Sequence, residues 1–168
     1  MKLLEANGYT CVDKTNVSGS DVCQQAILTG DFTVFPEYTG TIWYMIGGHD
    51  TVPEGGAEVL YNTLVEELAA AGQYYMGDRC SVNNTFCFVV DPEVAGAKGI
   101  TTLSELGAYM QEHPGEEKLA CTNEFAIRSD GLLGMKDVFG IDFGSEVYTM
   151  EKGVALKAVH DGEVSVCM

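Results

Sequence analysis

Positive charge is scarce in this sequence. Lys and Arg number 9 against 25 Asp and Glu, so the formal net charge of the 168-residue chain is −16 at pH 7. A field of that sign repels phosphate backbones and anionic lipid surfaces, which argues against nucleic-acid binding and membrane-surface binding. The charge either keeps the chain soluble and self-repelling or attracts a cationic ligand, and both interpretations stay open.

Long apolar runs are also missing. None approaches the ~20 residues that a membrane-spanning helix needs. The N-terminal segment MKLLEANGYT is not typical of a signal peptide, because Glu5 and Asn7 interrupt its apolar stretch. Hydrophobic residues still make up 46% of the chain, enough for the core of one ordinary domain or two small lobes. We expect a folded chain in solution, which is either a mature form or a segment of an exported protein.

Metal-binding and catalytic motifs are absent as well. The six cysteines form no C-x-x-C pair and the three histidines do not cluster with them, which favours buried thiols over a zinc site and leaves disulfide pairing open. No Ser-His-Asp order or pair of catalytic carboxylates is evident, and no glycine-rich phosphate loop follows the first predicted strand. An enzyme would need Cys23, Cys80 or Cys121 as a nucleophile without an evident base. We therefore expect a binding protein with no cofactor.

Strand and helix patterns alternate at the start of the chain. Residues Gly8–Lys14 alternate like a strand, Ser20 caps a predicted helix through Leu28 with Val22 facing inward, and Phe32–Phe35 is a second strand. This order predicts a βαβ unit and a parallel sheet, and hence an α/β fold.

Helical and strand signals continue along the rest of the chain. The strongest helical segment is Pro53–Gly72, where Leu60, Leu64 and Leu68 recur every four residues. Thr102 and Glu105 have capping-box spacing. Further predicted strands are Thr85–Asp91, Lys118–Thr122 and Val147–Met150, and further predicted helices are Gly131–Gly140 and Gly153–Val164, the last running into a short final strand.

A change of composition suggests two lobes. The segment Tyr74–Asn84 has no helical period and several turn-forming residues. We place a hinge there and predict a first lobe over residues 1–80 and a second over 81–168. An α/β chain with a central crossover and no phosphate loop favours a protein that binds its ligand in a cleft.

Aromatic residues crowd one turn. In the stretch DFTVFPEYTGTIWY, residues 31–44, five of the fourteen residues are aromatic. The stretch LLEANGYTCVDKTNVSGSDVCQQAILTGDFTVFPEYTGTIW resembles the first lobe of substrate-binding proteins from ABC transporters for quaternary ammonium compounds such as glycine betaine, choline and carnitine. The segments NNTFCFVV, KGITTLSEL, ACTNEFAIRSDGLLG and ALKAVHDGEVSV resemble its second lobe in the same order.

The resemblance implies a fold, a ligand and a partner. The fold is the type II periplasmic-binding-protein-like fold of two lobes, the ligand is a small quaternary ammonium compound held in an aromatic cage between them, and the partner is an ABC-transporter permease. It also implies an extracytoplasmic location, in the periplasm or at the cell surface. A trimethylammonium group carries charge but has no N–H to donate, so aromatic faces hold it at about 0.5–2 kcal/mol each.

Five ligand-binding residues follow from the resemblance. Tyr38 is a cage wall, and Thr41 contacts the polar end of the ligand. Phe86 stands where the family has a cage tyrosine, so the aromatic face is kept and the hydroxyl is lost. Asn84 stands where some members of the family have a backbone or side-chain oxygen near the cation, and Arg128 matches a position that in some members pairs with the carboxylate of betaine.

Each assignment has a structural alternative. Tyr38 is then a turn aromatic packed on its own lobe, Phe86 is core, and Thr41 is a helix cap. Arg128 forms instead a salt bridge with Asp130 or Glu124. Trp43 and Tyr44, which follow in the same stretch, are interpreted as core or rim residues.

The resemblance also implies that the first lobe is incomplete. Family members have a strand and helix before LLEANGYT and continue beyond DGEVSVCM with further cage tyrosines. The chain is then a fragment, a natural short form that closes its sheet in a swapped or edge-paired homodimer, or a remnant without a ligand. A degenerate or repurposed module that self-associates is thus the alternative function.

Overall fold

The chain divides into two compact units. The computed structural model describes residues 1–17, 19–72 and 74–168. The units are Met1–Asp78 and Arg79–Met168, so the junction lies inside the segment for which a hinge is predicted. Whether these units are the two lobes of the family stays a prediction.

Unit 1 is helical in its described residues. Helix α2 ends at Gly30, whose left-handed backbone (φ 81°) terminates it, and α3 runs directly into the π-helical turn η1. A small core forms around Trp43, Leu60 and Leu64. The bounds are α1 Lys2–Ala6, α2 Ser20–Thr29, α3 Thr39–Thr41, η1 Ile42–Ile46 and α4 Gly56–Ala71.

The two strands predicted for unit 1 are wrong. Gly8–Lys14 and Phe32–Phe35 form no strand, and the described part of unit 1 contains no ladder with which they could pair. A strand exists only through hydrogen bonds to a neighbour, so an alternating pattern without one leaves its apolar side chains in water. Val12 and Val34 are 75% and 71% exposed, and Val22, predicted to face inward on α2, is 49% exposed.

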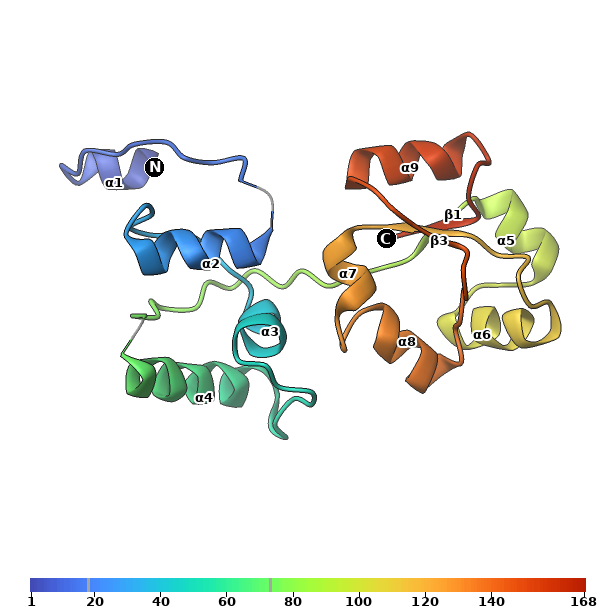
Figure 1. The fold of residues 1–168 in the computed structure, drawn as a ribbon, viewed down its shortest axis with the longest axis horizontal. Coiled ribbons are helices and arrows are strands. Elements are labelled where there is room, and N and C mark those ends of the chain that lie inside the picture. The colour runs from blue at the N-terminus through green and yellow to red at the C-terminus, as the bar shows by residue number, and fades with distance from the viewer. Residues whose placement is uncertain (18, 73) are drawn as a thin grey trace. The chain divides into compact units, whose positions relative to one another are not determined.

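Unit 2 is a four-stranded sheet with helices on both faces (Figure 1). The strand order is β1-β4-β2-β3; β4 and β3 pair with β2 in parallel, whereas β1 pairs with β4 antiparallel. The bounds are β1 Val89–Val90, α5 Pro92–Lys98, α6 Leu103–Glu112, β2 Leu119–Cys121, α7 Asn123–Ile127, α8 Leu132–Phe139, β3 Val147–Thr149, α9 Lys152–His160 and β4 Val166–Cys167.

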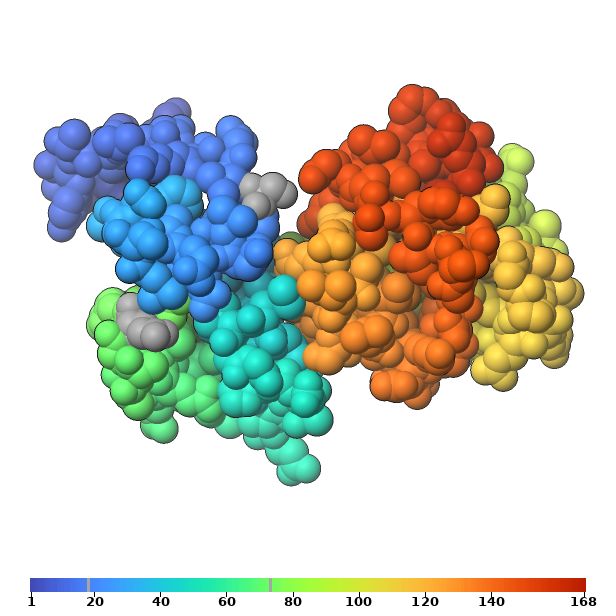
Figure 2. All heavy atoms as spheres, in the orientation of Figure 1, coloured from blue at the N-terminus to red at the C-terminus, as the bar shows by residue number. Residues whose placement is uncertain are grey.

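Successive side chains of β2 pack into two different hydrophobic cores. Leu119 and Cys121 of β2 pack with α6, α7 and the segment that follows α8, whereas Ala120 packs with Ala155 and Ala158 of α9. A strand buried on both faces is what a parallel, doubly covered sheet requires. Atoms of α7, α8 and α9 occupy much of the face of unit 2 that is visible in Figure 2. The predicted strands at Lys118–Thr122 and Val147–Met150 are confirmed, with slightly shorter bounds.

The strand predicted over Thr85–Asp91 is only partly present. Only Val89 and Val90 pair, because β4 offers Val166 and Cys167 as their partners. Thr85 to Cys87 are exposed and irregular. The apolar run is therefore a strand at Val89 and Val90, Phe88 packs partly buried against the core, and the residues before Phe88 lie at the surface.

The predicted capping box of α6 is confirmed, and it gives a pH prediction. Glu105 Oε2 accepts the Thr101 hydroxyl at 2.7 Å and the N–H groups of Thr101 and Thr102 at 2.8 and 2.9 Å. These hydrogen bonds lower the pKa of Glu105 from 4.5 to about 2, and the bonds from Thr101 have the largest effect. Because the folded-state pKa is the lower one, ionised Glu105 stabilises the helix start above about pH 4.5, and this contribution is lost as the pH falls toward 2.

We expect the Glu105 carboxyl carbon to titrate in NMR spectra with a midpoint near pH 2, together with the Thr102 amide. In Glu105→Gln the Thr102 amide should show no transition in this range. A Glu105 midpoint near 4.5 in the folded protein would contradict the capping argument.

Candidate functional site

The candidate site of unit 2 lies where β2 ends and β1 begins. Thr122 follows β2 and caps α7 by accepting the Phe125 N–H at 3.2 Å. Because β1 runs antiparallel to β4, which is parallel to β2, the residues before β1 reach the same edge of the sheet as the end of β2. The Phe86 and Phe125 rings meet there edge to face, with centroids 5.3 Å apart and planes at 70°. Carboxyl ends of parallel strands are where α/β sheets hold ligands.

Phe86 offers an aromatic surface to solvent on a firm support. Its side chain lies on Phe125, which is 1% exposed, and Phe125 also contacts Phe88 at 6.0 Å between ring centroids. Phe86 itself is 39% exposed, so the alternative that it is plain core does not hold. A ring held in this way can receive a cation on its electron-rich face.

Arg128 is buried beside this ring. Its guanidinium carbon lies 5.3 Å from the Phe86 ring centroid, and the residue is 3% exposed. Nε and Nη2 donate to the two oxygens of Asp130, each at 2.7 Å, and Nη1 donates to Glu124 at 2.8 Å. Both salt bridges of the structural alternative are present. Burial acts to lower the pKa of Arg128, but the bonds and charges of Asp130 and then Glu124 outweigh it and raise the pKa.

A glycine lets the chain fold back against Arg128. A Cβ at Gly131 would lie 2.4 Å from the Phe125 carbonyl oxygen and 3.0 Å from the Arg128 Cβ. The space between α7 and α8 therefore admits only glycine without a backbone shift. This close approach fixes where Arg128 and Asp130 lie relative to Phe125.

In unit 1 the aromatic turn is the start of a helix. Tyr38 is the N-terminal flanking residue of α3 and is 51% exposed, and its N–H donates to Glu37 at 2.8 Å. Thr41 is the last residue of α3, directly before η1, is 6% exposed, and makes no capping hydrogen bond with its side chain. The helix-cap alternative for Thr41 is therefore wrong, because the helix begins two residues earlier.

Trp43 belongs to the core, which is one of the two interpretations, core or rim, that the sequence leaves open. It is 6% exposed, its Nε1 donates to the Thr51 carbonyl at 2.7 Å, and its ring stacks on His49 with centroids 3.7 Å apart. His49 in turn contacts Glu67 of α4 at 3.0 Å. Trp43 thus ties the turn after η1 to α4.

The structure brings together only some of the predicted residues. Phe86 and Arg128 are neighbours, and Asn84 lies close to Phe86 in sequence within an exposed segment. Tyr38 and Thr41 belong to the other unit. Sequence reasoning missed Phe125, although the spacing of Thr122 and Phe125 is that of a helix cap and its partner N–H.

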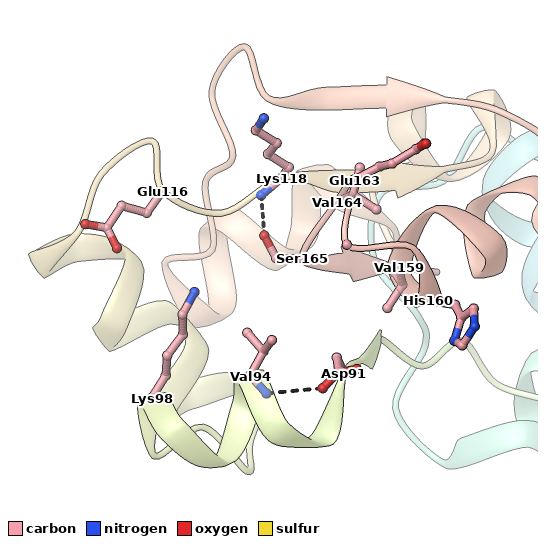
Figure 3. Close-up of a pocket in the computed structure, with 11 residues that line it drawn as sticks. Asp91, Val94, Lys98, Glu116, Lys118, Val159, His160, Glu163, Val164 and Ser165 are labelled. Atoms are coloured by element: carbon pink, nitrogen blue, oxygen red, sulfur yellow. Dashed lines mark hydrogen bonds between the residues drawn. The ribbon is translucent and has the colours of Figure 1, made fainter.

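A pocket of about 300 Å³ lies at the opposite edge of the sheet of unit 2 (Figure 3). Its polar groups serve the fold: Asp91 accepts the Val94 N–H at the start of α5, and Ser165 accepts the Lys118 N–H at 2.9 Å. No Phe, Tyr or Trp lines it. It is therefore a poor host for an alkylated ammonium group.

The described residues offer little for metal or thiol chemistry. No group of three or more His, Cys, Asp or Glu among them could hold a metal ion. All six cysteines are free thiols; only Cys121 and Cys167 are buried, so the prediction that most are buried is wrong. Burial raises the pKa of the Cys121 thiol, which disfavours the thiolate that a nucleophile needs. No helix in the described ranges is long and apolar enough to cross a membrane.

The comparisons with known proteins agree with one another. A family model described as the substrate binding domain of ABC-type glycine betaine transport system matches residues 1–168. The glycine betaine-binding protein YehZ of Escherichia coli K12 is 27% identical over 146 residues, which cover 87% of this chain and 48% of YehZ. The glycine-betaine-binding protein of Pseudomonas aeruginosa is 26% identical over 176 residues, covering 94% of this chain and 51% of its own length.

Two solved structures share the fold. The structure of apo YehZ from E. coli has a TM-score of 0.58 at 25% identity. The match covers 99% of this chain and 61% of the YehZ chain. A glycine betaine/carnitine/choline ABC transporter structure has a TM-score of 0.61 at 22% identity. That match covers 99% of this chain and 60% of the transporter chain. This chain thus has the fold of the type II periplasmic binding proteins, and it spans about half the length of the curated relatives that it matches.

The chain belongs to the family of substrate-binding domains of ABC-type glycine betaine transport systems. The predicted family and fold class are confirmed. Proteins of this family are extracytoplasmic transport components that bind a small ligand and deliver it to a permease, and the family is not one of enzymes.

Proposed function

We propose that this chain is a solute-binding module that captures a small quaternary ammonium compound, namely glycine betaine, choline or carnitine, for uptake by an ABC transporter. An aromatic cage holds the ligand, with Tyr38 from unit 1 and Phe86 from unit 2 among its walls. Thr41 and Asn84 contribute polar contacts, and Arg128 lines the site beside Phe86. The permease of the transporter is the partner that receives the ligand.

One observation carries this proposal: the Phe86 ring is 39% exposed yet held from behind by buried Phe125. Burial of a large apolar side chain is favourable by about 1.5–3 kcal/mol, so a ligand that covers the exposed part of the Phe86 ring gains part of this free energy. Tyr38 is likewise half exposed, at 51%. Aromatic faces are the surfaces that bind an onium ion lacking N–H donors.

The Tyr38→Ala variant tests the cage. We expect calorimetric titration of the wild-type chain to show saturable binding of glycine betaine, choline or carnitine. Loss of one cage wall should weaken it about tenfold or more, since one cation–π contact contributes up to about 2 kcal/mol when dry. The matched control is Tyr75→Ala, which removes a 96% exposed tyrosine from the same unit and should leave the Kd unchanged.

Two results would count against the cage. If Tyr38→Ala and Tyr75→Ala weaken ligand binding equally, Tyr38 is not part of the site. If titration with each of the three ligands gives only the heat of dilution, the chain binds none of them. The transport function is then rejected, and the second candidate function, a self-associating module without a ligand, remains.

The second candidate function is a self-associating module that keeps the fold without a ligand. The exposed apolar residues of unit 1 favour it, among them Val12 and Val34 in extended segments that pair with no strand among the described residues. Such segments are templates for pairing with a second copy. A homodimer in size-exclusion chromatography with light scattering would support this candidate, and a well-folded monomer would oppose it.

A further inference from the structure

Two cysteines of unit 2 lie on the same face of its sheet, next to the candidate site. Cys167 of β4 is 1% exposed and packs with Ala155 and Ala158 of α9. Its partner across the β1–β4 ladder is Val89. Because the side chains of an extended chain alternate between two faces, Cys87 shares the face of Val89 and therefore lies beside Cys167.

The rings on either side of Cys87 support this alternation. Phe88 packs against the core that contains Phe125, and Phe86 lies on the Phe125 ring. Both rings thus occupy the face opposite to Cys167, and exposed Cys87 between them faces the other way. Burial raises the pKa of the Cys167 thiol, and the charge of Cys87 raises it further, so the two sulfur atoms lie within electrostatic reach of each other.

A small shift brings the two cysteines into range of a cross-link. Diagonal neighbours in an antiparallel ladder have Cα atoms about 7–8 Å apart, whereas the Cα atoms of a disulfide lie at about 4.4–6.8 Å. Cys87 therefore has to move toward β4 by about 1 Å. In the described part of the chain Cys87 belongs to no ladder, and its side chain is exposed, so this shift separates no pair of strands.

We infer that Cys87 and Cys167 are a thiol pair that closes to a reversible disulfide and thereby fixes the Phe86 ring. Disulfides persist in oxidising compartments outside the cytosol, and proteins of this family are extracytoplasmic. Phe86 directly precedes Cys87, so a cross-link at Cys87 restricts the main chain that carries the ring. The cross-link itself needs no ligand, whereas its effect on ligand affinity rests on the proposed function.

The oxidant is a small-molecule disulfide, RSSR, such as oxidised glutathione. The solvent-exposed Cys87 thiolate attacks one sulfur of RSSR, forms a mixed disulfide and releases RS⁻. The Cys167 thiolate then attacks the Cys87 sulfur and displaces the second RS⁻. The protons of the two cysteines end on the two RS⁻ groups, so two protein thiols are oxidised to a disulfide while RSSR is reduced to two RSH.

Peptide mapping without reduction tests the pair after the full chain is incubated with oxidised glutathione. We expect a linked peptide pair that joins Cys87 to Cys167. In Cys167→Ala the glutathione should stay on Cys87, because the second thiol is missing. Cys80→Ser, which removes another exposed cysteine of unit 2, is the control and should leave the cross-link in place. A Cys80–Cys87 link, or a wild-type Cys87 that keeps its glutathione, would overturn the inference.

Hydrogen exchange measures the effect on the site without a ligand. We expect the Phe86 and Phe88 amides to gain about tenfold or more protection in the oxidised chain, because the cross-link suppresses local opening of this segment. Dithiothreitol should reverse the gain. The amides of α4, in unit 1, are the control and should exchange equally in both forms. Equal exchange of Phe86 in the oxidised and reduced forms would show that the disulfide does not restrain the ring.

Ligand titration separates this inference from the proposed function. We expect the Kd of choline to be about two- to tenfold lower for the oxidised chain, because the ring no longer has to be ordered on binding. In Cys87→Ser, the oxidant should leave the Kd unchanged. If neither form binds choline, glycine betaine or carnitine, the proposed function fails, while the cross-link and its effect on exchange stand. If the chain binds choline equally in both forms, the thiol pair does not act on the site.

Discussion

Replacing Phe125 by alanine is expected to lower the free energy of unfolding of unit 2 by about 3–5 kcal/mol, the usual cost of truncating a buried phenylalanine. Phe125 is 1% exposed and lies at the centre of the aromatic cluster, in contact with Phe86 and Phe88. Its loss leaves a cavity under the candidate site. Amides in β2 should then lose at least about a hundredfold of their protection from hydrogen exchange, since each 1.4 kcal/mol corresponds to tenfold.

Two controls make this measurement specific. Trp43, the single tryptophan, lies in the core of unit 1, so its fluorescence during urea unfolding reports on that unit. We expect Phe125→Ala to lower the free energy of unfolding measured by Trp43 fluorescence less than the free energy of unfolding measured by hydrogen exchange of the β2 amides. Val138→Ala removes a 73% exposed side chain from α8 and should change stability by no more than about 0.5 kcal/mol. A similar, small effect for both variants would show that Phe125 does not support the sheet.

The same variant connects stability with binding. Phe86 loses the edge-to-face contact that fixes its ring, so any Phe125→Ala protein that stays folded should bind the ammonium ligand more weakly. The weakening should apply equally to choline and glycine betaine.

Elements with local signals were predictable from the sequence. The capping box of Thr102 and Glu105 starts α6, and Gly140 ends α8 with a left-handed backbone at φ 69°. In each case the determining contacts lie within a few residues, so the sequence pattern and the structure agree. Helix α5 was missed, although Asp91 caps it and Pro92 follows at its first position.

Elements that depend on distant partners were less predictable. The apolar alternation of Gly8–Lys14 is that of a strand, but pairing is decided by which other segment lies alongside. The candidate site has the same character. That Arg128 could pair with Asp130 or Glu124 was visible from spacing, but only the packing of β1 beside β4 shows that Phe86 is half exposed above Phe125.

The largest steric effect is expected at Gly107 in α6. A Cβ there would lie 1.8 Å from the carbonyl oxygen of Phe139, at the end of α8, and neither backbone can yield without separating the two helices. We expect Gly107→Ala to destabilise unit 2 by about 3 kcal/mol or more, beyond the typical range of overpacking, because the clash is with main chain rather than a movable side chain. Gly96→Ala is the matched control: it lies in α5 with nothing within 4 Å of a Cβ, and should stabilise by about 0.5–1 kcal/mol. If urea unfolding shows that Gly107→Ala lowers the free energy of unfolding of unit 2 while Gly96→Ala raises it, the packing of α6 on α8 is supported. If both substitutions raise it, this contact is not formed in solution.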